Sequence, residues 1–328
     1  MNIYSAMALL MASNQDISDD LLALTARLYY LDRLGQSEVA RMVNVSQAKV
    51  SRLLSLARER GIVQITVADY NPRATNLEQA LEDNFDLKEV LVIKTFSQLK
   101  IQEIRHTIAH FSAEILSNYI QSNNTVVVAG GRSLCSVINH MEPNQDARDI
   151  TVVQGMGNID SSIGGYDAIK LGSELASKFN GNFQMLNCPV YVPDAPTCDA
   201  LLALDPIKNV KQMYTDADLA FVGIGTSQNS VFADRNVVSE DDIQELGKAG
   251  AVGEMVGRFF DIDGNECDTD YRNRVISIEL DEIRKIPEVV AVVAGGQRSK
   301  AILGAIKGNL VKSLVIDEDG AKTLLSLK

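Results

Sequence analysis

Residues 36–61 read QSEVARMVNVSQAKVSRLLSLARERG, and their apolar positions predict two short helices joined by a turn. Val39, Ala40 and Val43 form a first apolar stripe at helical spacing. The second, longer stripe consists of Val50, Leu53, Leu54 and Ala57. Between the stripes lies Asn44, and asparagine is the residue after glycine that best tolerates the left-handed backbone of a sharp turn. This spacing predicts a helix-turn-helix.

The second helix carries a polar face that suits a DNA major groove. Ser46 precedes this helix, where its hydroxyl can accept a hydrogen bond from a first-turn amide. The face away from the apolar stripe has amide, hydroxyl and cationic groups, the chemistry that contacts base edges and phosphates. An ordinary helical hairpin with a solvated face is the alternative, but the turn, cap and spacing agree on DNA binding. The candidate DNA-binding residues are Gln47, Lys49, Ser51, Arg52 and Arg58. Arg52 and Arg58 would hold phosphates, while the others would read bases or position the helix.

The segments on either side complete the first predicted domain. A helix is expected from Ser18 to about Leu34, with acidic residues at its positive end. Its expected buried stripe is Leu21, Leu24, Leu28 and Leu31. After the hairpin, the alternation over 62–67 predicts a wing strand packed on it. We therefore expect a winged helix-turn-helix domain over 18–69, preceded by an N-terminal extension, 1–17.

The charge distribution is compatible with a small DNA-binding face on an acidic protein. The whole chain has a net charge of −12. Within 36–61, five basic residues oppose two acidic ones, so this stretch carries +3 and the remainder carries −15. The acidic remainder keeps the protein off random DNA. Binding should therefore depend on a basic face that an oligomer presents more than once.

Cysteine, histidine and hydropathy patterns indicate a cytoplasmic protein without a metal or other cofactor. The cysteines form no CxxC pair and have no metal-like spacing with the histidines. His106 and His110 lie four apart, but the glutamate of HExxH is absent. The first Lys or Arg is Arg27, which argues against an export signal, and no apolar run approaches the roughly 20 residues needed to span a bilayer.

Beyond Asn71-Pro72, short β-branched runs alternate with amphipathic segments, which is typical of an α/β domain with a parallel sheet. We expect this second domain over 70–328. The longest predicted helix covers 100–119. The predicted strands are 90–96, 125–129, 150–154, 183–191, 219–224, 289–294 and 313–316.

Two glycine turns resemble each other and predict an anion site. Residues 126–133 (VVVAGGRS) and 292–300 (VVAGGQRSK) each combine a buried strand, a glycine pair, and basic and hydroxyl residues that open a helix. Glycines let backbone amides approach an anion, and the helix start adds partial positive charge. Glycine turns at 155–157 and 223–226 also end strands. Neither GxGxxG nor GxxxxGK[ST] occurs, which argues against a dinucleotide or a nucleoside triphosphate. The pattern favours a small anionic or polyhydroxylated ligand.

Several ordered blocks resemble the SorC/DeoR-type sugar-binding transcriptional regulators of bacteria. The blocks are LTARLYYLDRLGQSEVARMVNVSQAKVSRLLSLARERGIVQITV (24–67), ADLAFVGIG (217–225), GAVGEMVGRFFDIDG (250–264), AVVAGG (291–296) and KSLVIDEDGAKTLL (312–325). The resemblance implies a repressor or activator of a carbohydrate operon, typically a tetramer. It also implies a C-terminal domain similar to phosphosugar isomerases and glucosamine-phosphate deaminases, which binds sugar or sugar phosphate without turning it over.

The resemblance also implies which residues bind the effector. The turn at 130–133 corresponds to the family's Gly-x-x-Thr phosphate loop, with Ser133 in place of threonine. Glu254 stands where the family usually has an aspartate that accepts hydrogen bonds from sugar hydroxyls, and its extra methylene should change which sugar fits. Either Arg298 or Lys300 stands where a lysine reaches the effector. The candidate effector-binding residues are Gly130, Gly131, Arg132, Ser133, Gln154, Gly155, Glu254, Arg298 and Lys300.

These patterns lead to one functional expectation and two alternatives. We expect a non-enzymatic regulator that binds double-stranded operator DNA and a small carbohydrate or sugar-phosphate effector, and that forms a homo-oligomer. The first alternative is a sugar-phosphate isomerase or deaminase with an accessory helical domain, in which Glu254 would be the general base. The second is a carbohydrate-binding protein whose hairpin mediates protein contacts.

Overall fold

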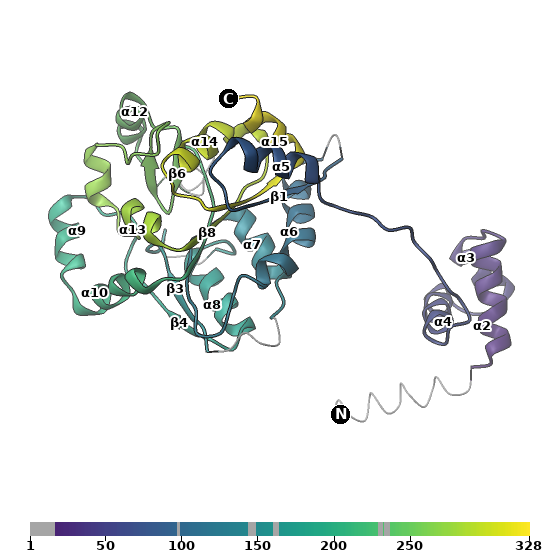
Figure 1. Ribbon diagram of the computed structural model, residues 1–328. Coiled ribbons are helices and arrows are strands. Elements are labelled where there is room, and N and C mark those ends of the chain that lie inside the picture. Colours follow the sequence, from purple (N-terminus) through teal and green to yellow (C-terminus); the bar gives the residue numbers. More distant parts are fainter. Residues whose placement is uncertain (1–16, 97–98, 144–148, 160–163, 229–231, 233–236) are drawn as a thin grey trace. The chain divides into compact units, whose positions relative to one another are not determined.

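The computed structural model divides into two compact units, Met1–Tyr70 and Asn71–Lys328, shown in Figure 1. The residues that it describes are 17–96, 99–143, 149–159, 164–228, 232 and 237–328. The N-terminal extension expected over 1–17 lies outside the described residues except for Ile17. Among the described helices, none has both the length and the apolar character needed to cross a bilayer.

The first unit contains the predicted helix-turn-helix. Its elements are α2 (Asp19–Ala26), the π-helical continuation η1 (Arg27–Leu31), α3 (Gln36–Met42) and α4 (Gln47–Glu59). Asn44 adopts a φ of 53°, as the turn requires, and Ser46 caps α4 by accepting a 3.2 Å hydrogen bond from the Lys49 amide. Val39, Val50 and the other predicted apolar positions lie in one core between the helices. The local pattern therefore gave the correct motif.

One prediction for this unit was wrong in part and another was wrong. Of the predicted stripe, Leu28 is buried and Leu21 packs against the core, whereas Leu24 is 48% exposed and Leu31 is 70% exposed. The buried residues of α2 itself are Leu22, Thr25 and Ala26, because the face that meets α4 depends on the position of α4. The predicted wing over 62–67 is not a strand. A strand needs a neighbour for its backbone hydrogen bonds, and the described part of this unit contains no other strand.

The second unit is built around a seven-stranded sheet in which all paired strands are parallel. In spatial order the strands are β1 (Glu89–Ile93), β9 (Ser313–Asp317), β8 (Glu288–Val292), β5 (Leu219–Val222), β2 (Thr125–Val128), β3 (Thr151–Gln154) and β4 (Asn182–Gln184). This confirms the α/β class and every predicted strand except 183–191, of which only the first residues pair in the sheet. The remainder contains Pro189, which has no amide hydrogen for a ladder, and it forms only isolated bridges.

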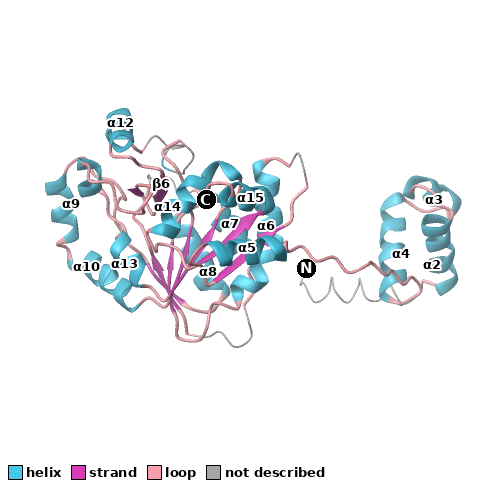
Figure 2. Ribbon diagram, turned by 45° about the horizontal axis from the view of Figure 1, so that its top comes forward, coloured by secondary structure: helices cyan, strands magenta, loops and turns pink. Residues whose placement is uncertain are grey.

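Helices cover both faces of the sheet (Figure 2). Helices α6, α7 and α8 pack side by side, while α5, α14 and α15 form a second group. The elements outside the sheet are α5 (Thr75–Asn84), α6 (Ile101–Ser117), α7 (Arg132–His140), α8 (Ala168–Lys178), α9 (Ala195–Leu202), α10 (Asp205–Gln212), η2 (Met213–Asp216), α12 (Glu240–Lys248), β6 (Gly253–Met255), β7 (Arg258–Phe260), η3 (Asp270–Arg274), α13 (Leu280–Lys285), η4 (Gly296–Arg298), α14 (Ser299–Lys307) and α15 (Glu318–Leu325). The long predicted helix over 100–119 is α6.

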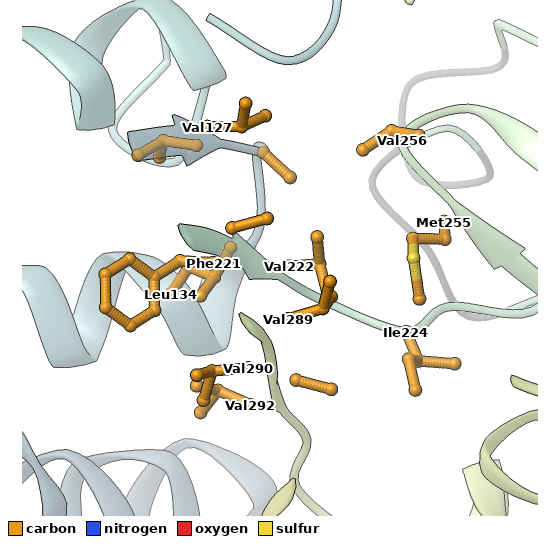
Figure 3. Close-up of a cluster of buried hydrophobic side chains, with 14 of the residues drawn as sticks. Val127, Leu134, Phe221, Val222, Ile224, Met255, Val256, Val289, Val290 and Val292 are labelled. Atoms are coloured by element: carbon orange, nitrogen blue, oxygen red, sulfur yellow. The ribbon is translucent and has the colours of Figure 1, made fainter. Parts of the chain in front are cut away.

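β5 is apolar along its whole length and β8 is apolar after its first residue, as expected for central strands with both faces covered. Figure 3 shows Phe221 beside Leu134 of α7, and Ile224 close to Met255 of the β6–β7 hairpin. All four side chains are buried. The sheet core therefore holds the ends of β2, β5 and β8 rigidly, and the loops that leave these strands begin from fixed positions.

Candidate functional site

The strand order places a crevice at the carboxyl ends of β2 and β5. From β2 the chain continues to β3 on one side, whereas from β5 it continues to β8 on the other side. Connections in such sheets are right-handed, so the two chains leave toward opposite faces. Open α/β sheets bind their ligands where neighbouring strands diverge in this way. The glycine turns after β2, β5 and β8 therefore meet at one edge.

A cleft occupies this position. Its cavity volume is about 60 Å³. The lining residues are Arg105, Gly130, Gly131, Arg132, Ser133, Leu134, Met156, Ile159, Gly223, Ile224, Gly225, Phe232, Glu254, Val256, Val292, Val293 and Arg298.

The first glycine turn brings the start of α7 to the cleft. A side chain at Gly130 would be tightly packed, because a Cβ there would lie 3.2 Å from the Tyr166 carbonyl oxygen. The amide of Gly131 donates to the same carbonyl at 2.9 Å and anchors the turn. Arg132 and Ser133 then form the first turn of α7, where the helix leaves amides without intrahelical partners. An anion in the cleft would meet these amides and the partial positive charge of the helix.

Glu254 is the acidic residue that lines the cleft among the described residues. It lies on β6, and its backbone bridges Gly225 of the loop after β5 through hydrogen bonds of 2.8 and 2.9 Å. Burial raises the pKa of its carboxyl group to about 7, although a hydrogen bond from the Gly257 amide and the charge of Arg298 oppose the shift. The Gly257 amide donates to Oε1 at 2.6 Å. The group can therefore change its protonation state near neutral pH.

The hairpin turn beside Glu254 is strained. Val256 has a φ of 52° and Gly257 a φ of 84°, so both central residues of the β6–β7 turn are left-handed. This conformation matches a two-residue hairpin, but it is unfavourable for a β-branched residue. Strained residues tend to gather at functional sites, and Val256 lines the cleft. The strain supports the cleft as a site.

Three arginines reach the cleft from different elements. Arg298 ends η4 after the second glycine turn, where Gly295 has a φ of 86°, and its guanidinium donates to the Ala294 carbonyl at 2.7 Å. Arg132 begins α7, and Arg105 comes from α6. Arg298 and Arg105 are both buried. Convergence of several cations on a small space favours an anionic ligand.

The sequence analysis did not identify Arg105. A signal was present, because this arginine lies on the face of α6 that is otherwise apolar or small. The buried residues of α6 are Arg105, Ile108, Ala109, Ser112, Ala113, Leu116 and Ser117. An arginine is rarely found on a buried helix face, so such a position is a candidate site residue.

Three candidate effector residues do not line the cleft. Gln154 is fully buried. Its side-chain amide donates to the Met156 carbonyl at 2.7 Å, and its side-chain oxygen accepts the Leu186 amide at 3.0 Å. Gly155 has no room for a side chain, since a Cβ would lie 2.9 Å from Val127. Lys300 is exposed on α14. Of the two basic candidates after β8, Arg298 is the one at the cleft.

The candidate DNA-binding residues lie on the surface of α4. Gln47, Lys49, Ser51, Arg52 and Arg58 are all exposed, whereas the apolar residues of the helix are buried. A further arginine near the end of the helix, Arg60, is used differently. It forms a 2.8 Å ion pair with Asp19 and donates to the Ile17 carbonyl at 2.9 Å, which ties α4 to the start of α2. The polar residues of α4 are therefore exposed within this unit.

Other constellations remain structural. The rings of His106 and His140 are 4.9 Å apart, but no group of three or more His, Cys, Asp or Glu among the described residues has a geometry that could hold a metal. The Asp261–Gly264 stretch is a turn in which the Asp261 carboxylate accepts the Asp263 amide at 3.0 Å. It connects the bridged residues Phe260 and Glu266, as a hairpin turn does.

Comparisons with known proteins agree with this architecture. Residues 71–326 match the family described as "Putative sugar-binding domain". The deoxyribonucleoside regulator of Bacillus subtilis (strain 168) is 29% identical over 303 residues, which are 92% of this chain and 96% of that protein. The transcriptional regulator LsrR of Enterobacter sp. (strain 638) is 27% identical over 316 residues, or 94% of each chain. The full-length sorbitol operon regulator SorC of Klebsiella pneumoniae has a similar fold, with a TM-score of 0.75, 24% identity, and coverage of 94% of this chain and 99% of that one.

Proposed function

Because this chain belongs to the SorC/DeoR-type family of sugar-binding transcriptional regulators, we propose that it binds operator DNA through α4 and a sugar or sugar phosphate in the cleft. The observation that carries the proposal is the arginine-lined cleft at the divergence of β2 and β5. The negative charge of an anionic sugar would complement the positive charge of these arginines. The units 18–69 and 70–328 would then be the DNA-binding part and the effector-binding and oligomerisation part.

The exposed face of α4 supports the DNA-binding half of the proposal. Arg52 and Arg58 would contact phosphates, while Gln47, Lys49 and Ser51 would read base edges or position the helix. An oligomer would present this face more than once. Two copies related by a twofold axis would prefer half-sites about 34 to 36 Å apart, or a multiple of that distance.

Within the cleft, each end of a sugar phosphate has a suitable partner. The phosphate would lie at the start of α7, where Arg132, Arg105 and Arg298 surround it and first-turn amides face it. Sugar hydroxyls would hydrogen-bond to the carboxyl group of Glu254 on the other wall. If the ligand-bound and ligand-free arrangements differ in how copies pack, ligand binding changes the spacing of the α4 helices.

We propose that the chain is a regulator and not an enzyme, and that it acts in the bacterial cytoplasm, where operators and sugar phosphates meet. The relatives are named as regulators. The alternative of an isomerase or deaminase is favoured by one observation, the pKa of about 7 for buried Glu254, which suits a general base. Incubation with a panel of sugar phosphates decides between them. We expect no turnover at ordinary enzymatic rates, and such turnover would show that the regulator-only proposal is wrong.

The experiment that tests the regulator combines ligand response with DNA binding. Thermal-shift screening of sugars and sugar phosphates would identify the effector. A gel shift with the DNA upstream of the gene that encodes this chain would measure DNA binding. In the variant Arg132→Ala, we expect DNA binding to persist and its response to the effector to disappear. Lys300→Ala is the matched control, because this cation is exposed and outside the cleft. An unchanged response in Arg132→Ala would place the effector elsewhere.

A further inference from the structure

One peptide unit of the second glycine turn has a charged partner on each side. This unit joins Ala294 to Gly295, just after β8. Its N–H donates to Oδ1 of Asp317 at 2.5 Å, and its C=O accepts a hydrogen bond from the Arg298 guanidinium at 2.7 Å. The N–H and C=O of a trans peptide point in opposite directions. The acid and the arginine therefore lie on opposite sides of one peptide unit.

Asp317 reaches this peptide from outside the cleft. It is the last residue of β9, its side chain is fully buried, and it does not line the cleft. Its Oδ2 accepts the Gly320 amide at 3.0 Å, which caps α15. The turn packs against the same helix, since a Cβ at Gly296 would lie 2.7 Å from Oγ1 of Thr323. The carboxylate therefore joins the second glycine turn to the sheet and to α15.

The backbone of this turn does not fix its own orientation. Gly295 has a φ of 86°, and glycine adopts positive and negative φ about equally well. The Ala294–Gly295 peptide could therefore rotate unless another group holds it. A hydrogen bond to a carboxylate is stronger than one between neutral groups, and it polarises the peptide so that its C=O becomes a better acceptor. Asp317 thus holds the peptide and strengthens the bond that the same peptide accepts from Arg298.

We propose that Asp317 is a positioning residue for anion binding, because it holds the peptide that in turn holds the guanidinium of Arg298 at the cleft. This role rests on the proposed binding of an anionic ligand by Arg298. It also gives the two glycine turns different roles. The first turn would bind an anion through the first-turn amides of α7. In the second turn the Gly295 amide already binds an internal carboxylate, so this turn contributes through the side chain of Arg298.

Modification of arginines by phenylglyoxal, followed by mass spectrometry, tests the positioning in the full-length protein without a ligand. Asp317→Ser separates positioning from helix capping. Serine caps helices as well as aspartate does, but its single oxygen lies one bond closer to the backbone, so the Gly295 amide loses its acceptor. We expect Arg298 to react about tenfold faster in this variant, because the guanidinium leaves its buried position more often. Buried Arg258 of β7 should keep its rate.

Two further variants make this test decisive. Asp194→Ser is the matched control, because Asp194 caps α9, which does not line the cleft, and Arg298 should keep its rate there. Asp317→Asn keeps the shape of the side chain and removes its charge. Any bond to Gly295 is then weaker, so Arg298 should react at an intermediate rate. An unchanged rate of Arg298 in both Asp317 variants, or equal acceleration of Arg258 and Arg298, contradicts the proposal.

Binding of inorganic phosphate tests the consequence for the cleft. Protection of Arg132 from phenylglyoxal measures the affinity for phosphate in every variant. Asp317→Ser should raise the half-protecting concentration about tenfold in the natural background, and it should change this concentration little in Arg298→Ala. An equal effect in both backgrounds would show that Asp317 does not act through Arg298. If phosphate did not protect Arg132 in the natural protein, the proposed function would be contradicted, while the reaction rates of Arg298 would still decide the positioning role.

Discussion

At the residue scale, Glu254 connects the chemistry of the cleft to the stability of the folded protein. The carboxyl group has an ordinary pKa of 4.5 and a pKa of about 7 in the folded protein, because burial disfavours its charged form. The folded state therefore holds this proton more tightly than the unfolded state does. The stabilisation is complete below pH 4.5 and is lost as the pH rises through 7.

We expect Glu254→Gln to remove this pH dependence. As the pH rises from 4.5 to 8, the unfolding free energy of the natural protein should fall by about 3 kcal/mol relative to that of the variant. This value follows from the difference between the two pKa values at about 1.4 kcal/mol for each unit. Glutamine keeps an oxygen that can accept the Gly257 amide. Urea unfolding followed by circular dichroism at several pH values measures the difference. Parallel pH curves for the two proteins would mean that Glu254 does not titrate in this range.

The two basic residues after β8 differ in their environment, and we expect them to differ in function. Arg298 is buried at the cleft, while Lys300 is exposed on α14. Removing a cation that faces an anionic ligand in a buried site costs about 2 kcal/mol or more of binding free energy. A loss of about 1.4 kcal/mol corresponds to a tenfold weaker affinity. Arg298→Ala should therefore weaken effector binding at least about tenfold, and Lys300→Ala should leave it nearly unchanged. Isothermal titration with the effector from the thermal-shift screen measures both, and the reverse ranking would refute the assignment.

At the element scale, the cap on α4 is a local feature with a measurable effect. Ser46 accepts the Lys49 amide, and loss of such a cap costs about 1 kcal/mol. In Ser46→Ala, amides of α4 should exchange with solvent about fivefold faster. Ser51→Ala is the control, because this serine is exposed within the helix and alanine is a better helix former. Hydrogen exchange by mass spectrometry resolves the segment, and equal protection in both variants would argue against the cap.

The face of α4 should divide into positions that hold DNA and positions that read it. Arg52→Ala removes a phosphate contact, so it should weaken binding to all DNA and lower the slope of affinity against salt by about one. Gln47→Ala should cost about 1 to 3 kcal/mol mainly on the preferred operator. Fluorescence anisotropy with operator and random duplexes at several salt concentrations separates these effects. If both variants weakened the two duplexes alike, the division of roles would be wrong.

Element predictions succeeded where the pattern was local. The turn at Asn44 and the strands flanked by glycines followed from backbone preference and apolar runs. The stripe on the first helix failed at Leu24 and Leu31, because leucine spacing alone does not say which face of the helix meets α4. The wing failed because a β-prone segment becomes a strand only beside another strand.

At the scale of the whole molecule, the effector should act first on the unit that binds it. With the effector at 100 times its dissociation constant, the unfolding free energy of the unit Asn71–Lys328 should rise by about 2.7 kcal/mol. Without DNA, amides in the core of α4 should keep their exchange rates, since they belong to the other compact unit. Hydrogen exchange across the full chain, with and without effector, reports on both units at once. In the variant Arg132→Ala, addition of the effector should not slow hydrogen exchange at any segment. In the natural protein, effector-induced protection centred outside the cleft would show that the ligand binds elsewhere.

The sequence by itself determined the helix-turn-helix, the parallel α/β class and the glycine turns, because these depend on backbone preference and on periodicity over a few residues. Only the tertiary structure decided that the turns after β2, β5 and β8 meet, that Arg298 rather than Lys300 faces the cleft, and that Arg105 joins it from α6. Those positions depend on strand order and helix packing between segments far apart in the chain. Local spacing carries no information about which distant segment will be the neighbour.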